Sequence, residues 1–278
     1  MIPRFLKRRR PPECLFTVIV VAYDMDRELP RTLHSLSRQY QQRCEDLNYE
    51  VIVVDNGSPQ PVAQSLVSSF GPEFRLLRID DASPSPSAGI NQAAAMASGR
   101  NLGIMVDGAR MLSPGVLWWA SQAYRLQSRA LIAVLGFHLG PEHQSLSSRR
   151  GYGQEVEDQL LQRIDWPADG YRLFEIAALA GSANFGWYGP IAESNCIFVP
   201  ASLYREIGGY EERFVSPGGG LVNLDFYKRA CEAEKVELFY PVGEGCFHQT
   251  HGGVTTAGEH EHAATFDDLQ VEYQGIRG

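Results

Sequence analysis

The sequence predicts an α/β fold with a mostly parallel central sheet and helices on both of its faces. Segments such as TVIVVAY at 17–23 and LGIMVD at 102–107 are apolar on both faces, which is typical of fully buried strands. These segments alternate with helical patterns, as they do in sheets whose parallel strands are joined by helices. We therefore expect ligands to bind beyond the carboxyl ends of the strands.

The first half of the chain alternates strand and helix. Its first helix has apolar residues at spacings of four, three and four, namely Leu29, Leu33, Leu36 and Tyr40. In chain order we expect strands at 17–23, 50–55, 74–79 and 102–107, and helices at 29–40, 62–70, 90–99 and from 114 onward. Three of these strands end in AYD, VDN and VDG, so polar groups lie where a polar ligand would bind.

The second half is less regular. We expect helices at 155–164, 201–209 and 224–234, and a strand at 193–200. The long stretch at 165–190 has no clear periodicity. It contains Trp187 and Tyr188, whose rings either stack on a sugar ring or are buried in the core.

Composition limits the classes of function. The chain has 278 residues, 44% of them hydrophobic and 21% charged, which is ordinary for a globular protein with a sizeable core. Its formal net charge of −8 argues against general nucleic-acid binding, which needs a positive surface. Its five cysteines are scattered without metal-type pairs, which suits a reducing cytoplasm better than a disulfide framework.

The N-terminus is basic, with the run RFLKRRRPP at 4–12. Such a run is either a solvated end or a weak contact with anionic lipid headgroups. The prolines that follow it, and the lack of a small-residue cleavage site, argue against a secretory signal. Nowhere do about 18 apolar residues run together, so we expect no membrane span. The expected location is cytoplasmic, either soluble or peripheral at the inner membrane surface.

Two common nucleotide-binding motifs are missing. A dinucleotide-binding Rossmann turn needs glycines after the first strand, and AYDMDREL at 22–29 contains none. A P-loop, with its lysine after a glycine, is also absent. The segment GEGCFHQTHGG at 243–253 has a Gly-x-Gly but opens no helix, so neither fold is expected.

Four segments together resemble family 2 glycosyltransferases, which have the GT-A fold. They are FTVIVVAYDMDRELPRTLHSLSRQ at 16–39, YEVIVVDNGS at 49–58, AGINQAAAMASGRNLGIMVDGARMLSPG at 88–115 and ESNCIFVPASLYREIGGYEERF at 193–214. They occur in the family's order, and the resemblance extends over about residues 16–255. It implies transfer of a sugar from a nucleotide-sugar donor to an acceptor hydroxyl, usually with inversion and a divalent metal.

The resemblance assigns donor-binding residues to the strand ends. It implies that Ala22 and Tyr23 cradle the nucleoside and that Asp55 contacts its base and ribose. The alternative is that Asp55 only caps the NGS turn through hydrogen bonds to backbone. Gly89 and Asn91 open a helix whose free amides favour a diphosphate, although a plain helix start explains Asn91 as well.

The resemblance also implies a metal site. At Asp107 the family usually has Asp-x-Asp, which holds Mg²⁺ or Mn²⁺ against the donor diphosphate, but here the motif is Asp107–Gly108–Ala109. The resemblance also places Gly108 in the donor site. The single carboxylate is a weak site for a hard divalent cation, which prefers several oxygen ligands. A histidine after the last strand would complete the site, and His248 and His251 stand there. Imidazole suits Mn²⁺ better than Mg²⁺, the spacing does not decide between the two histidines, and the alternative is that they bond a loop carbonyl.

An inverting transfer also needs a carboxylate base. The family supplies it from an acidic pair before a late helix, and the matching stretch LVNLDFYKR at 221–229 has Asn223 in that place. Either Asp225 serves as the base, or Glu193 helps, or the enzyme is retaining and needs none. Asp225 could instead cap its helix, and Glu193 could pair with an arginine.

We therefore expect one GT-A domain with a smaller acceptor-side region. Residues 16–135 would bind the nucleotide-sugar, 136–258 would bind the acceptor and complete the metal site, 1–15 would be a basic extension and 259–278 a tail. The expected function is metal-assisted transfer from a nucleotide-sugar, a UDP-sugar by preference, to a carbohydrate or lipid-linked acceptor in polysaccharide biosynthesis. The alternative is an inactive GT-A domain that binds nucleotide or glycan, because two carboxylates are missing. A nucleotidyltransferase fits less well, since its glycine-rich basic signature is absent.

Overall fold

A seven-stranded sheet forms the centre of the computed structural model, which describes residues 14–142, 147, 150–183, 185–189, 191, 194–251 and 266–278. The strands lie in the order β10-β6-β9-β4-β1-β2-β3. Their bounds are β1 Phe16–Ala22, β2 Tyr49–Asp55, β3 Phe74–Arg78, β4 Asn101–Met105, β6 Ala130–Ala133, β9 Cys196–Pro200 and β10 Glu237–Phe239. Only the two pairings of β9 are antiparallel, so the mostly parallel central sheet is confirmed.

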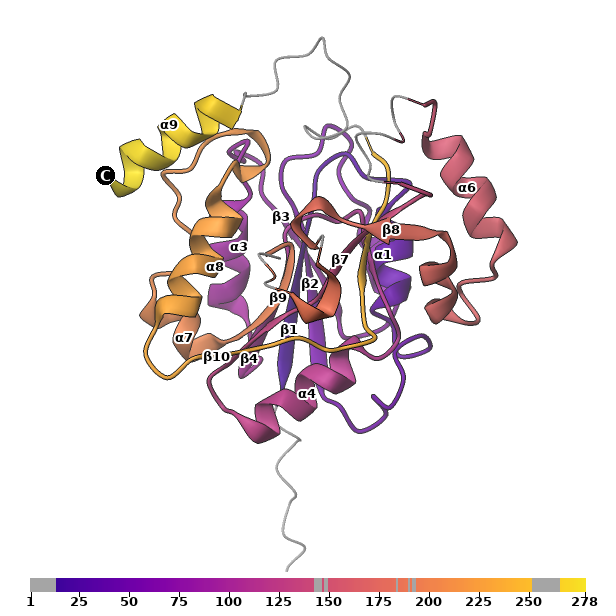
Figure 1. Cartoon of the computed structure of the whole chain (residues 1–278), viewed down its shortest axis with the longest axis horizontal. Helices are drawn as coiled ribbons and strands as arrows, with labels where there is room; N and C mark the ends of the chain where they lie inside the picture. Colours follow the sequence, from indigo (N-terminus) through magenta and orange to yellow (C-terminus); the bar gives the residue numbers. More distant parts are fainter. Residues whose placement is uncertain are drawn as a thin grey trace, which may run out of the picture.

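Helices cover both faces of this sheet, as Figure 1 shows. They are α1 Leu29–Ser35, α2 Gln64–Ser68, α3 Ser87–Met96, α4 Val116–Leu126, α6 Gln154–Arg163, α7 Ala201–Glu206, α8 Val222–Glu232 and α9 Phe266–Arg277. Successive residues of β1 point to opposite faces. Val20 therefore packs in one buried cluster with Leu33 of α1, whereas Val21 packs in another with Ile90 of α3 and Phe226 of α8.

A second, four-stranded sheet lies beside the first, in the order β5-β11-β7-β8. Its short strands are β5 Arg110–Leu112, β7 Gly136–Leu139, β8 Ala177–Leu179 and β11 Cys246–His248. Most of this sheet was not expected, because three- and four-residue strands carry too little periodicity to be recognised. Its core joins Phe137 and Phe247 to Leu161 of α6 and Leu173 of the 3₁₀ helix Gly170–Ile176. This packing involves much of the stretch 165–190, which has no clear periodicity in the sequence.

Two expected elements differ from the structure. The first helix, expected at 29–40, ends at Ser35, and the chain continues in turns. Leu36 and Tyr40 are nevertheless buried, so the apolar spacing correctly identified core residues but not their backbone. The segment 259–278, expected as a tail, contains the helix α9, whose Tyr273 and Ile276 pack against the cluster formed by α3, α7 and α8.

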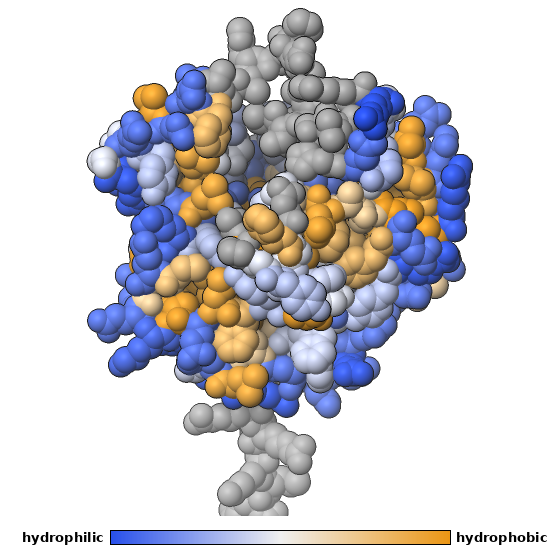
Figure 2. Space-filling view, viewed as in Figure 1, coloured by the Kyte–Doolittle hydropathy of each residue, from blue (hydrophilic) through white to orange (hydrophobic). Residues whose placement is uncertain are grey.

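The surface in Figure 2 is mostly hydrophilic along its margins, with an apolar patch over β8. Exposed apolar side chains in this part of the chain include Leu179, Phe185 and Tyr188, the last of them 92% exposed. Trp187 instead packs against Phe137 and Phe174, so the structure separates the two residues proposed as an acceptor platform. Within the described residues, no helix is long and apolar enough to cross a membrane. The basic extension falls almost wholly outside those residues.

Candidate active site

Asp107 lies in the turn that leaves β4 at the carboxyl end of the central sheet. The turn is fixed from two sides. Asp107 Oδ1 accepts a hydrogen bond from the Ala109 N–H at 2.8 Å, and the Thr32 hydroxyl of α1 donates to the Gly108 carbonyl at 2.7 Å. The other oxygen, Oδ2, is thus left to face the second sheet.

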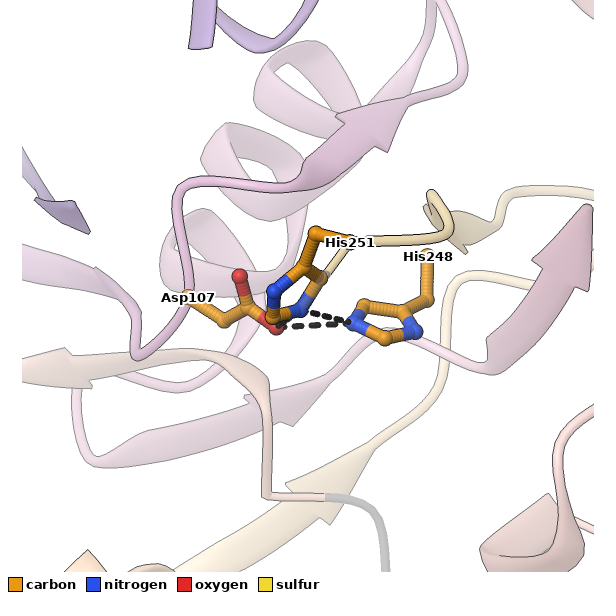
Figure 3. A group of neighbouring side chains, drawn as sticks. All are labelled: Asp107, His248 and His251. Atoms are coloured by element: carbon orange, nitrogen blue, oxygen red, sulfur yellow. Dashed lines mark hydrogen bonds and ion pairs between the residues drawn. The ribbon is translucent and has the colours of Figure 1, made fainter. Parts of the chain in front are cut away.

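His248 and His251 approach that oxygen from the end of β11. His248 is the last residue of the strand and is 3% exposed, and its place is set by pairing with β5 and β7. Three residues later the chain brings His251 back toward the same point. Figure 3 shows both imidazole rings directed at the Asp107 carboxylate.

The three side chains form a tight cluster. His248 Nε2 lies 2.8 Å from Asp107 Oδ2, His251 Nε2 lies 3.4 Å from the same oxygen, and the two Nε2 atoms are 3.1 Å apart. The Nε of Arg110 lies 3.8 Å from Asp107 Oδ2 and adds a positive charge at the edge. Asp107 and the two histidines are therefore brought together as the sequence suggested.

Their pKa values reflect this contact. Burial opposes ionisation of Asp107, yet the two histidines hold its pKa well below the ordinary value. Burial and then Arg110 lower the pKa of His248, although Asp107 opposes that shift. For His251 burial also disfavours the charge, but the hydrogen bond and charge of Asp107 outweigh it and raise the pKa. The lowered pKa of His248 favours its neutral form, the form in which imidazole binds metals.

The donor set fits a divalent cation. Ligand atoms at about 2.1 Å from one ion, at right angles to each other, lie about 3 Å apart. The separations in the cluster, 2.8, 3.1 and 3.4 Å, match that spacing. One oxygen and two imidazole nitrogens suit Mn²⁺ better than Mg²⁺, which prefers oxygen alone. Among the described residues, these three form the one group with metal-site geometry.

Ala109 occupies the place of the second family aspartate, and its side chain is fully buried. Its backbone links the two halves of the cluster instead, because its N–H bonds Asp107 and its carbonyl accepts the Gln249 N–H at 2.8 Å. His248 at the end of β11 and His251 beyond it approach the Asp107 carboxylate from the other side.

The predicted nucleoside residues lie at the neighbouring strand ends. Ala22 ends β1 and is buried, and Tyr23 beyond it is 54% exposed, so its ring is accessible to a ligand. Asp55 ends β2 and is fully buried. Its carboxylate accepts hydrogen bonds from the N–H groups of Ser58 and Val62 and from Arg78, so the cap of the turn is present. These bonds and the ion pair outweigh burial and lower the pKa of Asp55.

Gly89 and Asn91 lie in α3 and contact protein rather than open space. A Cβ on Gly89 would lie 2.9 Å from Val54 Cγ1, so glycine allows α3 to pack closely on β2. The Asn91 side chain accepts from the Tyr204 hydroxyl and the Tyr210 N–H, and donates to the Tyr210 carbonyl and to Glu212. Their donor-binding role stays a prediction, and these contacts give each residue a packing role.

Asp225 lies in the first turn of α8 and is 1% exposed. Arg277 of α9 donates to both of its oxygens at 2.6 and 2.7 Å, and Arg229 donates to one at 2.8 Å. Although burial opposes it, the pKa of Asp225 is lowered by these two arginines. A base of lowered pKa with occupied oxygens is a weak proton acceptor, so these contacts disfavour the predicted role. Glu193 lies outside the described residues.

Part of the chain is similar to a known family. Residues 17–117 match the model of glycosyl transferase family 2. The match confirms the recognition made from the sequence and places the segment, which ends just inside α4, among glycosyltransferases. It includes Asp107 and precedes both histidines, so they lie beyond the matched segment.

Solved structures confirm the GT-A architecture around the family 2 segment. The crystal structure of S. aureus TarS 1–349 in complex with UDP-GlcNAc aligns with a TM-score of 0.60 and 16% identity over 93% of this chain. The complex of the same protein with UDP aligns with a TM-score of 0.58 and 14% identity over 86%. This chain spans 66% and 61% of those chains. No curated protein sequence gives a significant match.

Two groups near the histidines carried no sequence signal. Arg27 sits in the turn before α1, where an arginine looks like an ordinary solvated residue. Glu157 lies on α6 and is fully buried, although its helix is rich in charge. They lie 130 positions apart and meet in the fold with Oε1 of Glu157 3.1 Å from Arg27 Nη2. No local pattern identifies such a pair.

Proposed function

We propose that this chain transfers a sugar from a nucleotide-sugar donor, a UDP-sugar by preference, to a hydroxyl of a carbohydrate or lipid-linked acceptor. The observation that carries the proposal is the convergence of Asp107, His248 and His251 at the carboxyl end of a GT-A sheet. The proposed donor is a uridine nucleotide because one structurally similar protein was crystallised with UDP and with UDP-GlcNAc.

In this proposal the chain's own groups divide the work. Asp107, His248 and His251 would hold a divalent cation, with Mn²⁺ favoured by the two imidazoles. When bound, such an ion neutralises charge on the departing diphosphate. Tyr23 offers an exposed ring beside the nucleoside position, and exposed Tyr188 offers one on the acceptor side.

A second function has its own support. A GT-A domain that binds nucleotide or glycan without transferring sugar would need no base, and Asp225 is held by two arginines. Asn223 at the usual acidic position points the same way, since an amide is no base. Slow hydrolysis of the bound donor separates the two functions, because it requires a working donor site but no acceptor.

The first experiment is calorimetric titration with UDP, GDP, dTDP and CMP, each with and without Mn²⁺. Wild type is compared with Asp107→Ala. Tight binding of UDP that needs Mn²⁺ and is lost in the variant supports the donor site. The matching UDP-sugars are then tested for hydrolysis by release of UDP.

The outcomes separate the alternatives. Metal-dependent binding together with hydrolysis supports a transferase, and binding without hydrolysis favours the inactive domain. Equal binding of UDP with and without Mn²⁺ would overturn the metal assignment. No binding of any nucleotide would overturn the proposed function as a whole.

A further inference from the structure

The two residues between the histidines are held by the rest of the protein. Gln249 is fully buried, and its amide donates to the Glu28 carbonyl at 3.1 Å and the Thr32 hydroxyl at 3.3 Å. Its N–H donates to the Ala109 carbonyl at 2.8 Å. His248 and Gln249 are thus fixed by the sheet and by α1, and the next question is what fixes His251.

Thr250 is held by an ion pair. Its N–H donates to Glu157 Oε2 at 2.8 Å, and its carbonyl accepts from Arg27 Nη1 at 3.1 Å. Arg27 Nη2 in turn donates to Glu157 Oε1 at 3.1 Å. The pair therefore binds both backbone groups of the residue that immediately precedes His251, and the three bonds close a ring.

Burying the Arg27–Glu157 ion pair costs free energy, so its presence calls for an explanation. Glu157 is fully buried, and burial raises its pKa because the Thr250 N–H and Arg27 only partly offset the loss of water. Arg27 is further fixed by Glu28 at 2.7 Å, Asp158 at 2.7 Å and the Gln154 carbonyl at 2.9 Å. Buried charge pairs of this kind contribute little net stability, so a positioning role is a better explanation than stability.

We propose that Arg27 and Glu157 are a positioning pair that places His251 against Asp107 by holding the backbone of Thr250. The proposal deepens the proposed function, since it assigns α6 and the turn before α1 to the cation site. Figure 1 places α6 at the side of the molecule beside α1, away from the central strands. A helix outside the family 2 segment would thereby set the geometry of the histidine.

The competing explanation is that the pair only docks α6 on α1. Asp158 tests this, because it lies next to Glu157 on α6 and also bonds Arg27 and Arg31, at 2.7 and 2.5 Å. It makes no contact with Thr250 among those described. Docking alone predicts similar effects of changing Asp158 and Glu157, whereas positioning predicts an effect of Glu157 alone.

The test uses the variants Glu157→Gln, Arg27→Lys and Asp158→Asn in the full chain. Glu157→Gln keeps the volume and an acceptor and should fold. Titration with Mn²⁺ in the presence of UDP should show affinity lowered about 10-fold or more for Glu157→Gln and Arg27→Lys, as for changes behind other metal ligands. The Asp158→Asn variant should bind within about twofold of wild type.

A second measurement needs no metal. Amide hydrogen exchange at Thr250 and His251 in the metal-free protein should quicken in Glu157→Gln and stay unchanged in Asp158→Asn. If wild type binds no Mn²⁺, the metal assignment in the proposed function fails, and this exchange still tests the pair. Equal effects of the two α6 variants, or wild-type exchange and affinity in Glu157→Gln, would overturn the proposal. In the Glu157→Gln/Arg27→Lys double variant, the loss of Mn²⁺ affinity should be no greater than the larger of the two single-variant losses.

Discussion

Asp107 and Asp225 are both carboxylates near the carboxyl end of the sheet, and their surroundings are opposite. Asp107 has a side chain 17% exposed and faces two imidazoles, whose nitrogens can give lone pairs to a cation. Asp225 has a side chain 1% exposed and faces two guanidinium groups, which can only donate. Both pKa values are lowered, so charge alone does not separate them.

The difference lies in what the partners leave open. At Asp107 Oδ2 the two imidazoles can accept as well as donate, so a cation can replace the hydrogen bonds among these three side chains. Around Asp225 every partner carries a fixed positive charge that excludes a cation and occupies both oxygens. A carboxylate therefore becomes a ligand or a structural anchor through its neighbours rather than through its own chemistry.

The largest expected effect is on the Asp107 side of the comparison. His248→Ala removes one of three donors, and we expect Mn²⁺ affinity in the presence of UDP to fall about 100-fold or more, beyond the 10- to 100-fold seen for groups behind ligands. Calorimetry with Mn²⁺ measures it. His251→Ala should lower the Mn²⁺ affinity by a similar factor if both imidazoles bind the ion.

His34→Ala is the matched control, because His34 is a partly buried histidine whose ring packs on Tyr40 and Trp166 instead. It should keep wild-type Mn²⁺ affinity. Retained affinity in His248→Ala, or equal losses in all three variants, would contradict the assignment of the cluster as a metal site.

The second effect is on stability at Asp225. Asp225→Asn leaves two arginines without their counter-charge, and we expect the free energy of unfolding to fall by about 3 kcal/mol, as for other broken buried pairs. Urea unfolding measures it. Mn²⁺–UDP affinity should not change, because the contacts of Asp225 described here are with α8 and α9.

Glu232→Gln on the same helix is the control. Glu232 pairs with Lys228 at an exposed i,i+4 position, and its loss should cost no more than about 0.5 kcal/mol. An Asp225→Asn variant as stable as this control would show that the anchor is unimportant. Lost glycosyl transfer with intact UDP binding would return Asp225 to the role of base.

The third prediction concerns how the stability contributed by Asp225 depends on pH. The folded pKa of Asp225 lies below the ordinary aspartate value of about 3.9, so the pair stabilises the protein above that value. Its contribution is lost as pH falls through the folded pKa. The difference in unfolding free energy between wild type and Asp225→Asn should be constant above about pH 5 and shrink below about pH 4. A difference that stays constant down to pH 3 would contradict the lowered pKa.

The parts of this comparison differ in how well the sequence predicted them. Parallel strands that are apolar on both faces are recognisable alone, and their carboxyl ends must share one edge, so Asp107 could be placed there. The spacing of His248 and His251 did not show whether both rings would face Asp107, because that depends on how the chain turns after β11. The short second sheet, to which β11 belongs, carried no such pattern.

Partners far apart in sequence were beyond prediction. Arg277 lies 52 positions from Asp225, and Arg27 lies 127 positions from Gln154, to whose carbonyl it donates. An aspartate in the first turn of a helix looks the same whether it faces solvent, substrate or arginine. The helix α9 decides between these environments, and the sequence analysis predicts only a tail there.

The smallest expected effect concerns Asn91, which was predicted to bind the donor and whose side chain hydrogen-bonds to Tyr204, Tyr210 and Glu212. Asn91→Ala leaves the Tyr204 hydroxyl and the Tyr210 N–H without their shared acceptor, and we expect a loss of about 1 to 2 kcal/mol in unfolding free energy. Urea unfolding and UDP titration on the same variant give the two readouts.

A structural role lowers stability and leaves UDP affinity within about twofold, because Asn91 then acts as Asp225 does, through partners inside the fold. A donor role instead weakens UDP binding more than it lowers stability. Since Tyr204→Phe removes one of the same hydrogen bonds without touching Asn91, it should reproduce part of the stability loss only in the first case.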